Sequence, residues 1–524
     1  MHILFFNFNS NIMAIKQKKH SKQHQPAQSF VIEPHLFFTL AVLLSICGIV
    51  AVLLTTGHYG PGLTTDSVYY VSSARNLAQG DGFVSFDGTP MLSWPPLYPM
   101  VLSVSAFLGG DVIEFARWFN ALLFCLIILL TITITEKIYG SRLCALIAGL
   151  LMLFSGTVLN VSINIWSEAL FIALILLATI FAHKIAVSEK TETKHVILFG
   201  TATAMACLTR YAGVAVYLAG VLFLMILASA SLKKKLYLVT IYSAFSLLPI
   251  AIWLARNIIL HGSMTGPRTP GTAGFFENIV LVIRQTAFAL FYNSSIGVIA
   301  LVLAALFAGI FGWKIFRKSG KWSFILLFIA VYIAFLIVTS SLVSFDAIND
   351  RLLSPIVPFV IIAIVCALVE GGKSLNKNLR IVLMLSLLVW AVNSIVFTTK
   401  FVNLSRTRGV GFYSLKMFRE SPLLKRVIEV RPTGRIFSNF PDLLYIKADV
   451  EALWTPMADG SRRELLEDIE AGKRINIIWF YYSWGRTVNI TEFLALNDEI
   501  TIHEAFRDGW IGTYPADRRI EPSE

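Results

Sequence analysis

The chain has 524 residues, of which 56% are hydrophobic and 15% are charged. Soluble domains carry about 25% charged residues, so this composition excludes an ordinary soluble protein and indicates a polytopic membrane protein. The formal net charge of +12 does not predict nucleic-acid binding, because the Lys and Arg residues are distributed among loops rather than gathered on one basic face.

A polar stretch, residues 1–34, opens the chain and is rich in Lys, Gln and His. This composition predicts a disordered tail, which we place in the cytoplasm. Met13 is an alternative start to Met1. The apolar run that follows has no small-residue cleavage site after it, so we expect a signal anchor rather than a removable signal peptide.

Residues 35–399 contain eleven apolar segments. Each approaches the roughly 20 residues that cross a bilayer, so we expect an α-helical bundle of about eleven transmembrane helices. Lys and Arg gather in alternate loops, as at Lys233, Lys234 and Lys235, and the positive-inside rule places those loops in the cytoplasm. The expected spans are residues 36–55, 114–135, 143–161, 166–183, 196–209, 211–229, 236–255, 294–313, 323–341, 352–369 and 380–397.

These charges predict a multi-pass membrane protein with its N-terminus in the cytoplasm, and the membrane that we expect is the plasma (inner) membrane. An odd number of spans then places residues 400–524 outside. Within this region GRIFSNFPDLLYIKA and INIIWFYYS predict a strand, a helix and a strand, so we expect a small extracytoplasmic α/β domain.

The first outer loop, residues 56–113, is the longest connection before this domain, and a patterned loop of that length is usually functional. Residues 66–79 have helical periodicity and end at a Gly-Asp-Gly turn. The segment 94–110 begins with prolines suited to a helix start and is too short to span comfortably, so we expect a helix near the membrane interface.

One face of the first of these helices combines a carboxylate, two phenols and a hydroxyl. Asp66, Tyr69, Tyr70 and Ser73 follow the spacing that brings side chains together on a helix, so they can converge on one ligand. The alternative for Asp66 is a helix cap, since an acid at a helix start is stabilised by the helix dipole. The two roles can coexist.

Other charged residues lie near the outer ends of the spans. Glu168 is a functional candidate, because an acid in or beside a membrane helix is costly; the alternative is an interfacial carboxylate that reaches water. Arg210 and Tyr211 lie at a similar level, and the alternative there is contact with lipid headgroups. Arg351 can bind a phosphate or pair with a nearby Asp such as Asp346.

Familiar nucleotide and hydrolase motifs are absent from the sequence, which contains no GxxxxGK[ST], no GxGxxG after a strand, no HExxH and no GxSxG. The sequence therefore argues against an ATP-driven pump and against an enzyme that binds nucleotide sugars in the cytoplasm. The five cysteines show no CxxC spacing, so neither a disulfide scaffold nor a zinc site is indicated.

Two motifs of the first loop, TTDSVYYVSSARNLAQGDGF and WPPLYPMVLSVSAFLGG, resemble the first outer loop of GT-C glycosyltransferases that use lipid-phosphate sugars. Families of this kind are the protein O-mannosyltransferases and the aminoarabinose transferases. SINIWSEALFIAL and NDRLLSPIVPF resemble later segments of the same families, so the resemblance covers residues 36–370. It implies a GT-C bundle with interfacial helices in the first outer loop.

The resemblance also implies a reaction and its residues. Asp66 is implied as the catalytic base that accepts the proton of an acceptor hydroxyl. The leaving lipid phosphate calls for outward-facing arginines, and direct displacement implies inversion at the anomeric carbon. The predicted substrate-binding residues are Tyr69, Tyr70, Arg75, Glu168, Arg210, Tyr211, Arg256 and Arg351.

The sequence departs from this family in two places. Many relatives have an Asp-Glu pair in the first loop, whereas Ser67 follows Asp66, so a second acid is either Glu168 or absent. Many also have a basic residue before the proline pair, where this chain has Trp94. We therefore assign no metal or other cofactor; a divalent metal is possible in this family but not indicated here.

The expected function is transfer of a sugar from a polyprenyl-phosphate donor to a lipid, glycan or protein acceptor at the outer face of the membrane, among membrane lipids and without nucleic acid. One alternative is a transporter or flippase that binds a lipid-linked sugar without cleaving it. The other is an inactive GT-C scaffold, which the lack of a second acid directly after Asp66 favours.

Overall fold

The computed structural model describes most of the chain outside its two ends. The predicted tail lies outside the described part, except for its last three residues. The described residues are 32–188, 192–226, 231–271, 273–319, 323–343, 346–455, 467–468, 471, 473, 475–482 and 500–514.

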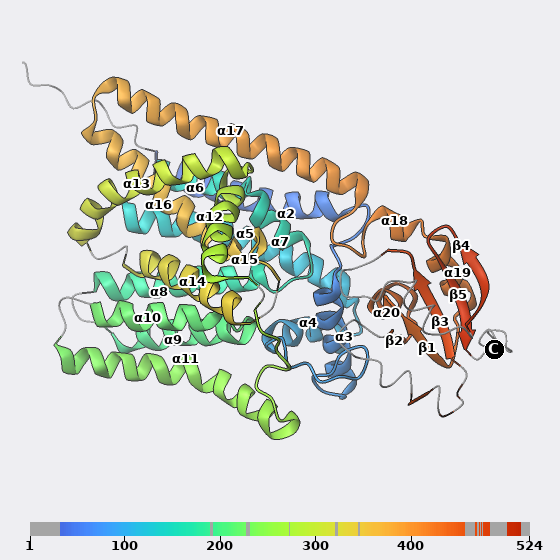
Figure 1. Ribbon diagram of the computed structural model, residues 1–524. Helices are drawn as coiled ribbons and strands as arrows, with labels where there is room; N and C mark the ends of the chain where they lie inside the picture. Colours follow the sequence, from blue (N-terminus) through green and yellow to red (C-terminus); the bar gives the residue numbers. More distant parts are fainter. Residues whose placement is uncertain are drawn as a thin grey trace, which may run out of the picture.

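A bundle of long helices forms the larger part of the structure, and a small sheet domain lies beyond one end of it (Figure 1). Each of the eleven predicted spans overlaps one or more of the helices in the described part of the chain. The bundle helices are α2 (Pro34–Thr56), α5 (Val112–Tyr139), α6 (Arg142–Leu153), α7 (Gly156–Ile163), α8 (Glu168–Val187), α9 (Thr193–Thr209), α10 (Gly213–Ile226), α11 (Leu232–His261), α12 (Phe275–Phe291), α13 (Ser294–Ser319), α14 (Ser323–Leu342), α15 (Asp350–Leu353), the short 3-10 helix η1 (Ser354–Ile356), α16 (Val357–Ser374) and α17 (Lys377–Arg408).

Seven helices in the described part of the chain are long and apolar enough to cross a membrane, or up to nine if each bent pair forms one span. The bent pairs are α6 with α7, at 54°, and α12 with the first part of α13, at 93°. The remaining difference from eleven comes from α9 and α10, whose 17 and 14 residues are short for a span. The chain is a multi-pass membrane protein.

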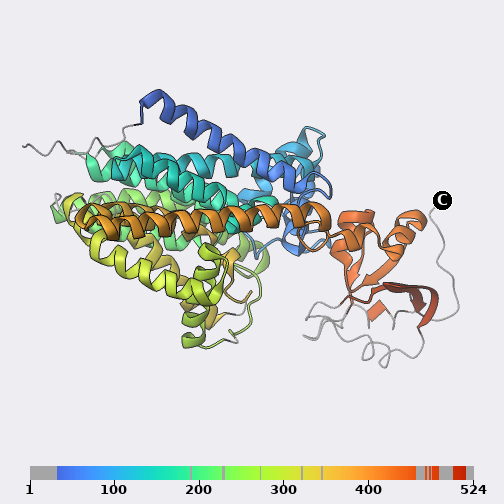
Figure 2. The ribbon, with the colours of Figure 1, turned by 90° about the horizontal axis from the view of Figure 1, so that it is seen from above.

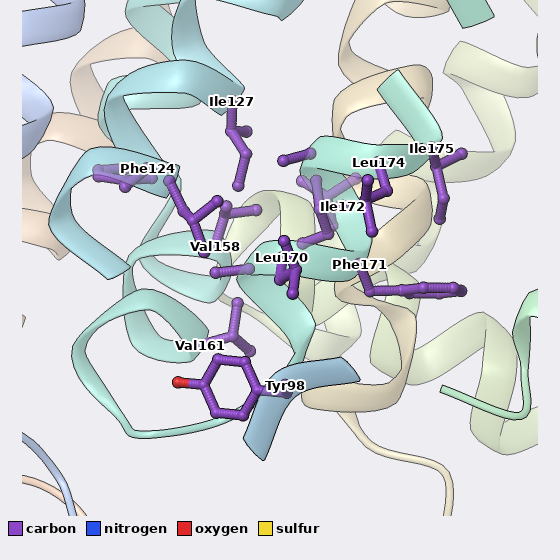
Figure 3. Close-up of a cluster of buried hydrophobic side chains, with 14 of the residues drawn as sticks. Tyr98, Phe124, Ile127, Val158, Val161, Leu170, Phe171, Ile172, Leu174 and Ile175 are labelled. Atoms are coloured by element: carbon purple, nitrogen blue, oxygen red, sulfur yellow. The ribbon is translucent and has the colours of Figure 1, made fainter. Parts of the chain in front are cut away.

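The core of the bundle lies around α8. Its apolar side chains pack on all sides, against Phe124 and Ile127 of α5 and against Val158 of α7, all of them buried (Figure 3). The outer helices α2, α11 and α17 instead expose many Leu, Val and Ile side chains. Apolar side chains on the outside as well as the inside are what a bundle in lipid requires.

Two helices of the first outer loop lie at the end of the bundle that faces the sheet domain, and Figures 1 and 2 show them between the two. The first, α3 (Thr65–Gln79), ends at Gly80, whose positive φ of 95° suits glycine. The second, α4 (Leu97–Phe107), follows the prolines. Both helices were predicted, and they pack on each other beside α5.

The C-terminal region forms the predicted small α/β fold. Its helices and strands are α18 (Lys416–Arg419), α19 (Pro422–Val430), β1 (Arg435–Ser438), α20 (Pro441–Ala448), β2 (Leu453–Trp454), β3 (Ile475–Phe480), β4 (Thr501–Phe506) and β5 (Gly509–Tyr514). The sheet order is β2-β1-β3-β5-β4, with β2, β1 and β3 parallel and β5 antiparallel to both of its neighbours. The domain boundary at residue 400 stays a prediction, since α17 continues to Arg408.

The short stretch before α3 is held on both sides by backbone hydrogen bonds. Gly62 N–H donates to Ile163 O at 2.9 Å, and Tyr413 N–H donates to Leu63 O at 2.9 Å. A Cβ on Gly62 would lie 1.9 Å from Asn164 Oδ1, so this close approach requires glycine. Segments from the bundle and from the C-terminal region therefore meet where α3 begins.

Candidate functional site

Arg351 lies at the centre of a group of charged side chains from distant parts of the sequence. Its Nη2 is 2.5 Å from Asp66 Oδ2, and its Nε is 2.6 Å from Glu168 Oε1. The guanidinium also lies over the ring of Trp166, 4.0 Å from the ring centroid. The two ion pairs and the aromatic ring together fix both the position and the plane of this side chain.

Arg210 completes the group, with its Nη1 2.7 Å from Glu168 Oε1. We call Asp66, Arg351, Glu168 and Arg210 the charge cluster; it contains two acids and two bases. Buried charges are tolerated only when they are paired, and here each acid contacts at least one arginine. The structure therefore brings together four of the predicted site residues.

The two acids of the cluster differ in their exposure. The Asp66 side chain is 25% exposed, whereas that of Glu168 is 1% exposed. Glu168 is the first residue of α8, where the helix dipole favours a negative charge. Asp66 is therefore the carboxylate that an incoming molecule can reach, and Glu168 is the one that holds the arginines.

The predicted cap at the start of α3 is formed by other residues. Thr64 is the N-cap, and its backbone N–H donates to Ser67 Oγ at 3.1 Å, which closes one half of a capping box. Asp66 lies in the first turn, and its carboxylate contacts Arg351 instead. Asp66 therefore does not form the side-chain cap, but its place in the first turn still lets the helix dipole stabilise its charge.

One carboxylate oxygen at the centre of the cluster is unpaired. Glu168 Oε2 is buried and has no hydrogen-bond partner among the described residues. An unsatisfied buried acceptor costs free energy, and in native proteins it asks for an explanation such as a functional role. This oxygen makes the cluster a stronger candidate for chemistry than an ordinary structural ion pair.

The two tyrosines predicted to share a face with Asp66 have different surroundings. Tyr70 is buried, and its hydroxyl lies 3.0 Å from Ser167 Oγ, which also accepts from Arg210 Nη1 at 3.2 Å. Burial raises the pKa of the Tyr70 hydroxyl, so this group stays protonated and supports the cluster through a hydrogen bond. Tyr69 instead stacks on Trp94, with 4.5 Å between the ring centroids.

Three further predicted substrate-binding residues, like Tyr69, do not join the cluster. Arg75 lies over the Tyr445 ring of the C-terminal domain, at 5.6 Å, and Arg256 lies over the Trp253 ring, at 4.9 Å. Tyr211 donates to Leu92 O at 2.8 Å and accepts from Trp253 Nε1 at 3.2 Å.

The backbone explains why Tyr211 separates from its neighbour Arg210. Arg210 has φ −148° and ψ 138°, an extended conformation in which successive side chains point in opposite directions. A common level in the membrane, on which the prediction rested, therefore does not bring two side chains to the same site.

Trp166 and Ser167 are site residues that the sequence reasoning missed. Trp166 lies under Arg351 and donates from Nε1 to Thr64 Oγ1 at 2.8 Å, while Ser167 links Tyr70 to Arg210. Both residues come just before Glu168, the first residue of α8. Their position next to a candidate functional acid was the only feature of the sequence that could have indicated them.

No group of three or more His, Cys, Asp or Glu side chains in the described part of the chain is close enough together to hold a metal ion.

A second buried acid, Asp442 at the start of α20, lies near the N-terminus of α3. Tyr413 donates its hydroxyl proton to Asp442 Oδ2, and the Tyr413 oxygen lies 3.1 Å from Thr65 Oγ1. Burial raises the pKa of the Asp442 carboxyl to about 6, although hydrogen bonds to Tyr413 and Thr65 oppose the increase.

This pKa predicts a pH dependence of stability. Because the folded protein binds the Asp442 proton more tightly than the unfolded chain does, the stabilisation is complete below about pH 4 and is lost as the pH rises through about 6. Asp442→Asn should therefore gain up to about 3 kcal/mol relative to wild type between pH 4 and pH 7.5. Thermal unfolding in detergent at both pH values tests this, and a constant difference between the two proteins would contradict it.

Comparison with known proteins places these features in a family context. Residues 93–253 match the family model described as dolichyl-phosphate-mannose-protein mannosyltransferase. The match includes Glu168 and Arg210 but not Asp66 or Arg351. No curated protein matches the sequence at a comparable level of significance.

The fold of most of the chain is found in solved structures. The crystal structure of ArnT from Cupriavidus metallidurans in the apo state superposes with a TM-score of 0.60 and 15% sequence identity, covering 93% of this chain and 99% of that one. The same protein bound to undecaprenyl phosphate gives a TM-score of 0.59 and 14% identity, with the same coverage. The chain therefore has the fold of the GT-C membrane glycosyltransferases, and the resemblance predicted from its sequence is confirmed.

Proposed function

We propose that the protein is an integral membrane glycosyltransferase that moves a sugar from a polyprenyl-phosphate donor to an acceptor on the extracytoplasmic face of the plasma (inner) membrane. The observation that carries the proposal is the charge cluster, in which a partly exposed carboxylate is held by an arginine beside a buried acid. The donor class is supported by the shared fold with ArnT, which has been seen bound to undecaprenyl phosphate.

Asp66 is the proposed general base. Its Oδ2 is held by Arg351, whereas Oδ1 has no hydrogen-bond partner within the described residues. As an acceptor hydroxyl attacks the anomeric carbon, Oδ1 takes its proton. The bond from that carbon to the phosphate oxygen breaks, its electron pair stays on the phosphate, and the configuration of the sugar inverts.

Arginines stabilise the leaving phosphate in this proposal. Arg351 and Arg210 lie in the cluster itself, and their guanidinium groups can accept a share of the developing charge. Arg256 makes no ion pair with any described residue, so its charge is available to the donor phosphate. The energy of the transfer comes from the sugar-phosphate bond, which agrees with the absence of a nucleotide-binding motif.

The acceptor is a lipid, a glycan or a protein that approaches from the same side. Tyr69 and Trp94 form an aromatic pair beside Asp66, and stacked rings of this kind favour the faces of sugars. Arg75 and Tyr445 bring the C-terminal domain to the same helix, α3. We therefore propose that the acceptor binds between the first outer loop and the C-terminal domain.

The test is transfer by the purified protein in liposomes. Radiolabelled polyprenyl-phosphate sugars are supplied as a panel, with total membrane extract as the source of acceptors. Release of free polyprenyl phosphate together with labelled acceptor is the expected result. Movement of intact donor across the bilayer without release would identify a transporter, and donor binding with neither outcome would identify an inactive scaffold.

A further inference from the structure

We propose that Tyr413 and Asp442 are positioning residues, through which the C-terminal region sets the orientation of the catalytic carboxylate of Asp66. This inference rests on the proposed glycosyltransferase function. It goes beyond that function by giving the C-terminal region a part in the chemical step.

A buried chain of hydrogen bonds connects the two parts of the molecule. Tyr413 and Asp442 are 2% and 0% exposed, respectively. Tyr413 contacts Asp442 on one side and Thr65 of α3 on the other. The second carboxylate oxygen of Asp442, Oδ1, accepts from Leu443 N–H at 3.0 Å, so the carboxylate is fixed to the start of α20.

The direction of this chain follows from its chemistry. An ionised carboxylate only accepts hydrogen bonds, so Tyr413 donates to Asp442. The Tyr413 oxygen can then accept from the hydroxyl of Thr65, which lies 3.1 Å away. The hydrogen bond from Tyr413 to Asp442 therefore has one direction when Asp442 is ionised, while the Thr65 hydroxyl donates either to Tyr413 or to Asp442.

Three consecutive residues at the start of α3 are each held by a different segment. Trp166 Nε1 donates to Thr64 Oγ1, Tyr413 contacts Thr65, and Arg351 contacts Asp66. The first and third of these partners belong to the bundle, and the second belongs to the C-terminal region. Loss of the second contact removes the hydrogen bond from the C-terminal region to the first turn of α3, although Tyr413 N–H still donates to Leu63 O just before the helix. The helix start can then tilt and move Asp66 away from the acceptor.

Geometry at a reacting carboxylate has a large effect on rate, because a misplacement of about 1 Å can slow a reaction by about 100-fold. Tyr413→Phe removes only the hydroxyl and keeps the ring that packs against Phe418 and Phe440. We expect its kcat for transfer to fall by about 10-fold with the KM for the donor within about twofold of wild type.

A matched control comes from the next residue. Ser414 Oγ donates to Pro61 O at 2.8 Å. Ser414→Ala therefore also removes one hydrogen bond between the C-terminal region and the first outer loop, but this bond reaches Pro61 and not the helix α3. We expect Ser414→Ala to keep wild-type kcat. An equal fall in kcat in both variants would overturn the positioning role, because it would show a general weakening of the contacts between the C-terminal region and the first outer loop.

A second pair of variants removes the possibility that Tyr413→Phe fails only through its stability. Thr65→Val removes the hydroxyl at the other end of the contact, and Thr65→Ser restores it. We expect the kcat of the Val variant to fall by about 10-fold and that of the Ser variant to stay close to wild type. Wild-type kcat in Thr65→Val would overturn the proposal.

Hydrogen exchange separates this inference from the proposed function. Backbone amides of residues 65–70 are expected to exchange faster in Tyr413→Phe than in Ser414→Ala, whether or not a donor has been identified. Faster exchange in Tyr413→Phe, together with no transfer by the wild-type protein, would support the contact between Tyr413 and Thr65. It would overturn both the role of this contact in catalysis and the proposed function. Wild-type transfer with unchanged exchange and kcat in Tyr413→Phe would overturn the inference alone.

Discussion

Asp66→Asn is expected to lower the rate of sugar transfer by about 100-fold or more while the protein stays folded. The amide has the size of the carboxylate, and its oxygen can accept a hydrogen bond from Arg351 in place of the ion pair at 2.5 Å. The amide does not accept a proton at neutral pH, however, so the general base is lost. Initial rates at saturating donor are the measurement.

Asp87→Asn is the matched control for this variant. Asp87 is another acid of the first outer loop, and its Oδ1 accepts from Thr89 N–H at 3.1 Å and from the Thr89 hydroxyl at 2.6 Å. The same chemical change there should leave the transfer rate within about twofold of wild type. Near-normal turnover in Asp66→Asn would remove Asp66 from the chemistry.

Arg351→Lys is expected to lower transfer by about 100-fold, although the charge is kept. Arg351 makes its two short contacts to carboxylates through different nitrogens, Nη2 for Asp66 and Nε for Glu168, while Nη1 lies 3.9 Å from Asp346 Oδ2. A single ammonium group on a flexible stem does not reproduce that fork or its stacking on Trp166. Asp66 then loses its fixed orientation, so kcat should fall.

Lysine is more informative than alanine at this position. Removing one partner of a buried ion pair typically costs about 3–5 kcal/mol, so Arg351→Ala would confuse loss of folding with loss of catalysis. Arg284→Lys, at an exposed position of α12, provides the control for the same substitution. If Arg351→Lys melts like wild type and transfers sugar at the wild-type rate, the cluster has a structural role only.

Several elements were predictable because their signal is local. Apolar runs gave the positions of the bundle helices, since burial in lipid demands apolar side chains along the whole helix. Gly80 after α3 and the prolines before α4 marked helix boundaries directly. Glu168 could also be singled out from the sequence, because an acid beside a membrane helix is costly enough to suggest a function.

The partners of these residues were not predictable in the same way. Arg351 contacts Asp66 across 285 residues, and Tyr413 contacts Thr65 across 348. Such pairs depend on how helices pack, which no periodicity in the sequence encodes. Arg256 and Tyr211 show the same limit, since the sequence predicted that they lie near the outer ends of spans but not which side of the bundle they face.

The charge cluster also has a consequence for how the protein is made. Glu168 is synthesised before both of its arginines, and the second of them, Arg351, follows it by 183 residues. Until then Asp66 lacks its arginine and Glu168 has only Arg210, so we expect the start of α8 to stay near water or the insertion machinery. Once Arg351 has been synthesised, it can pair with both Asp66 and Glu168. A ribosome that stops before this residue should therefore leave a chain that quality-control proteases recognise as unfinished.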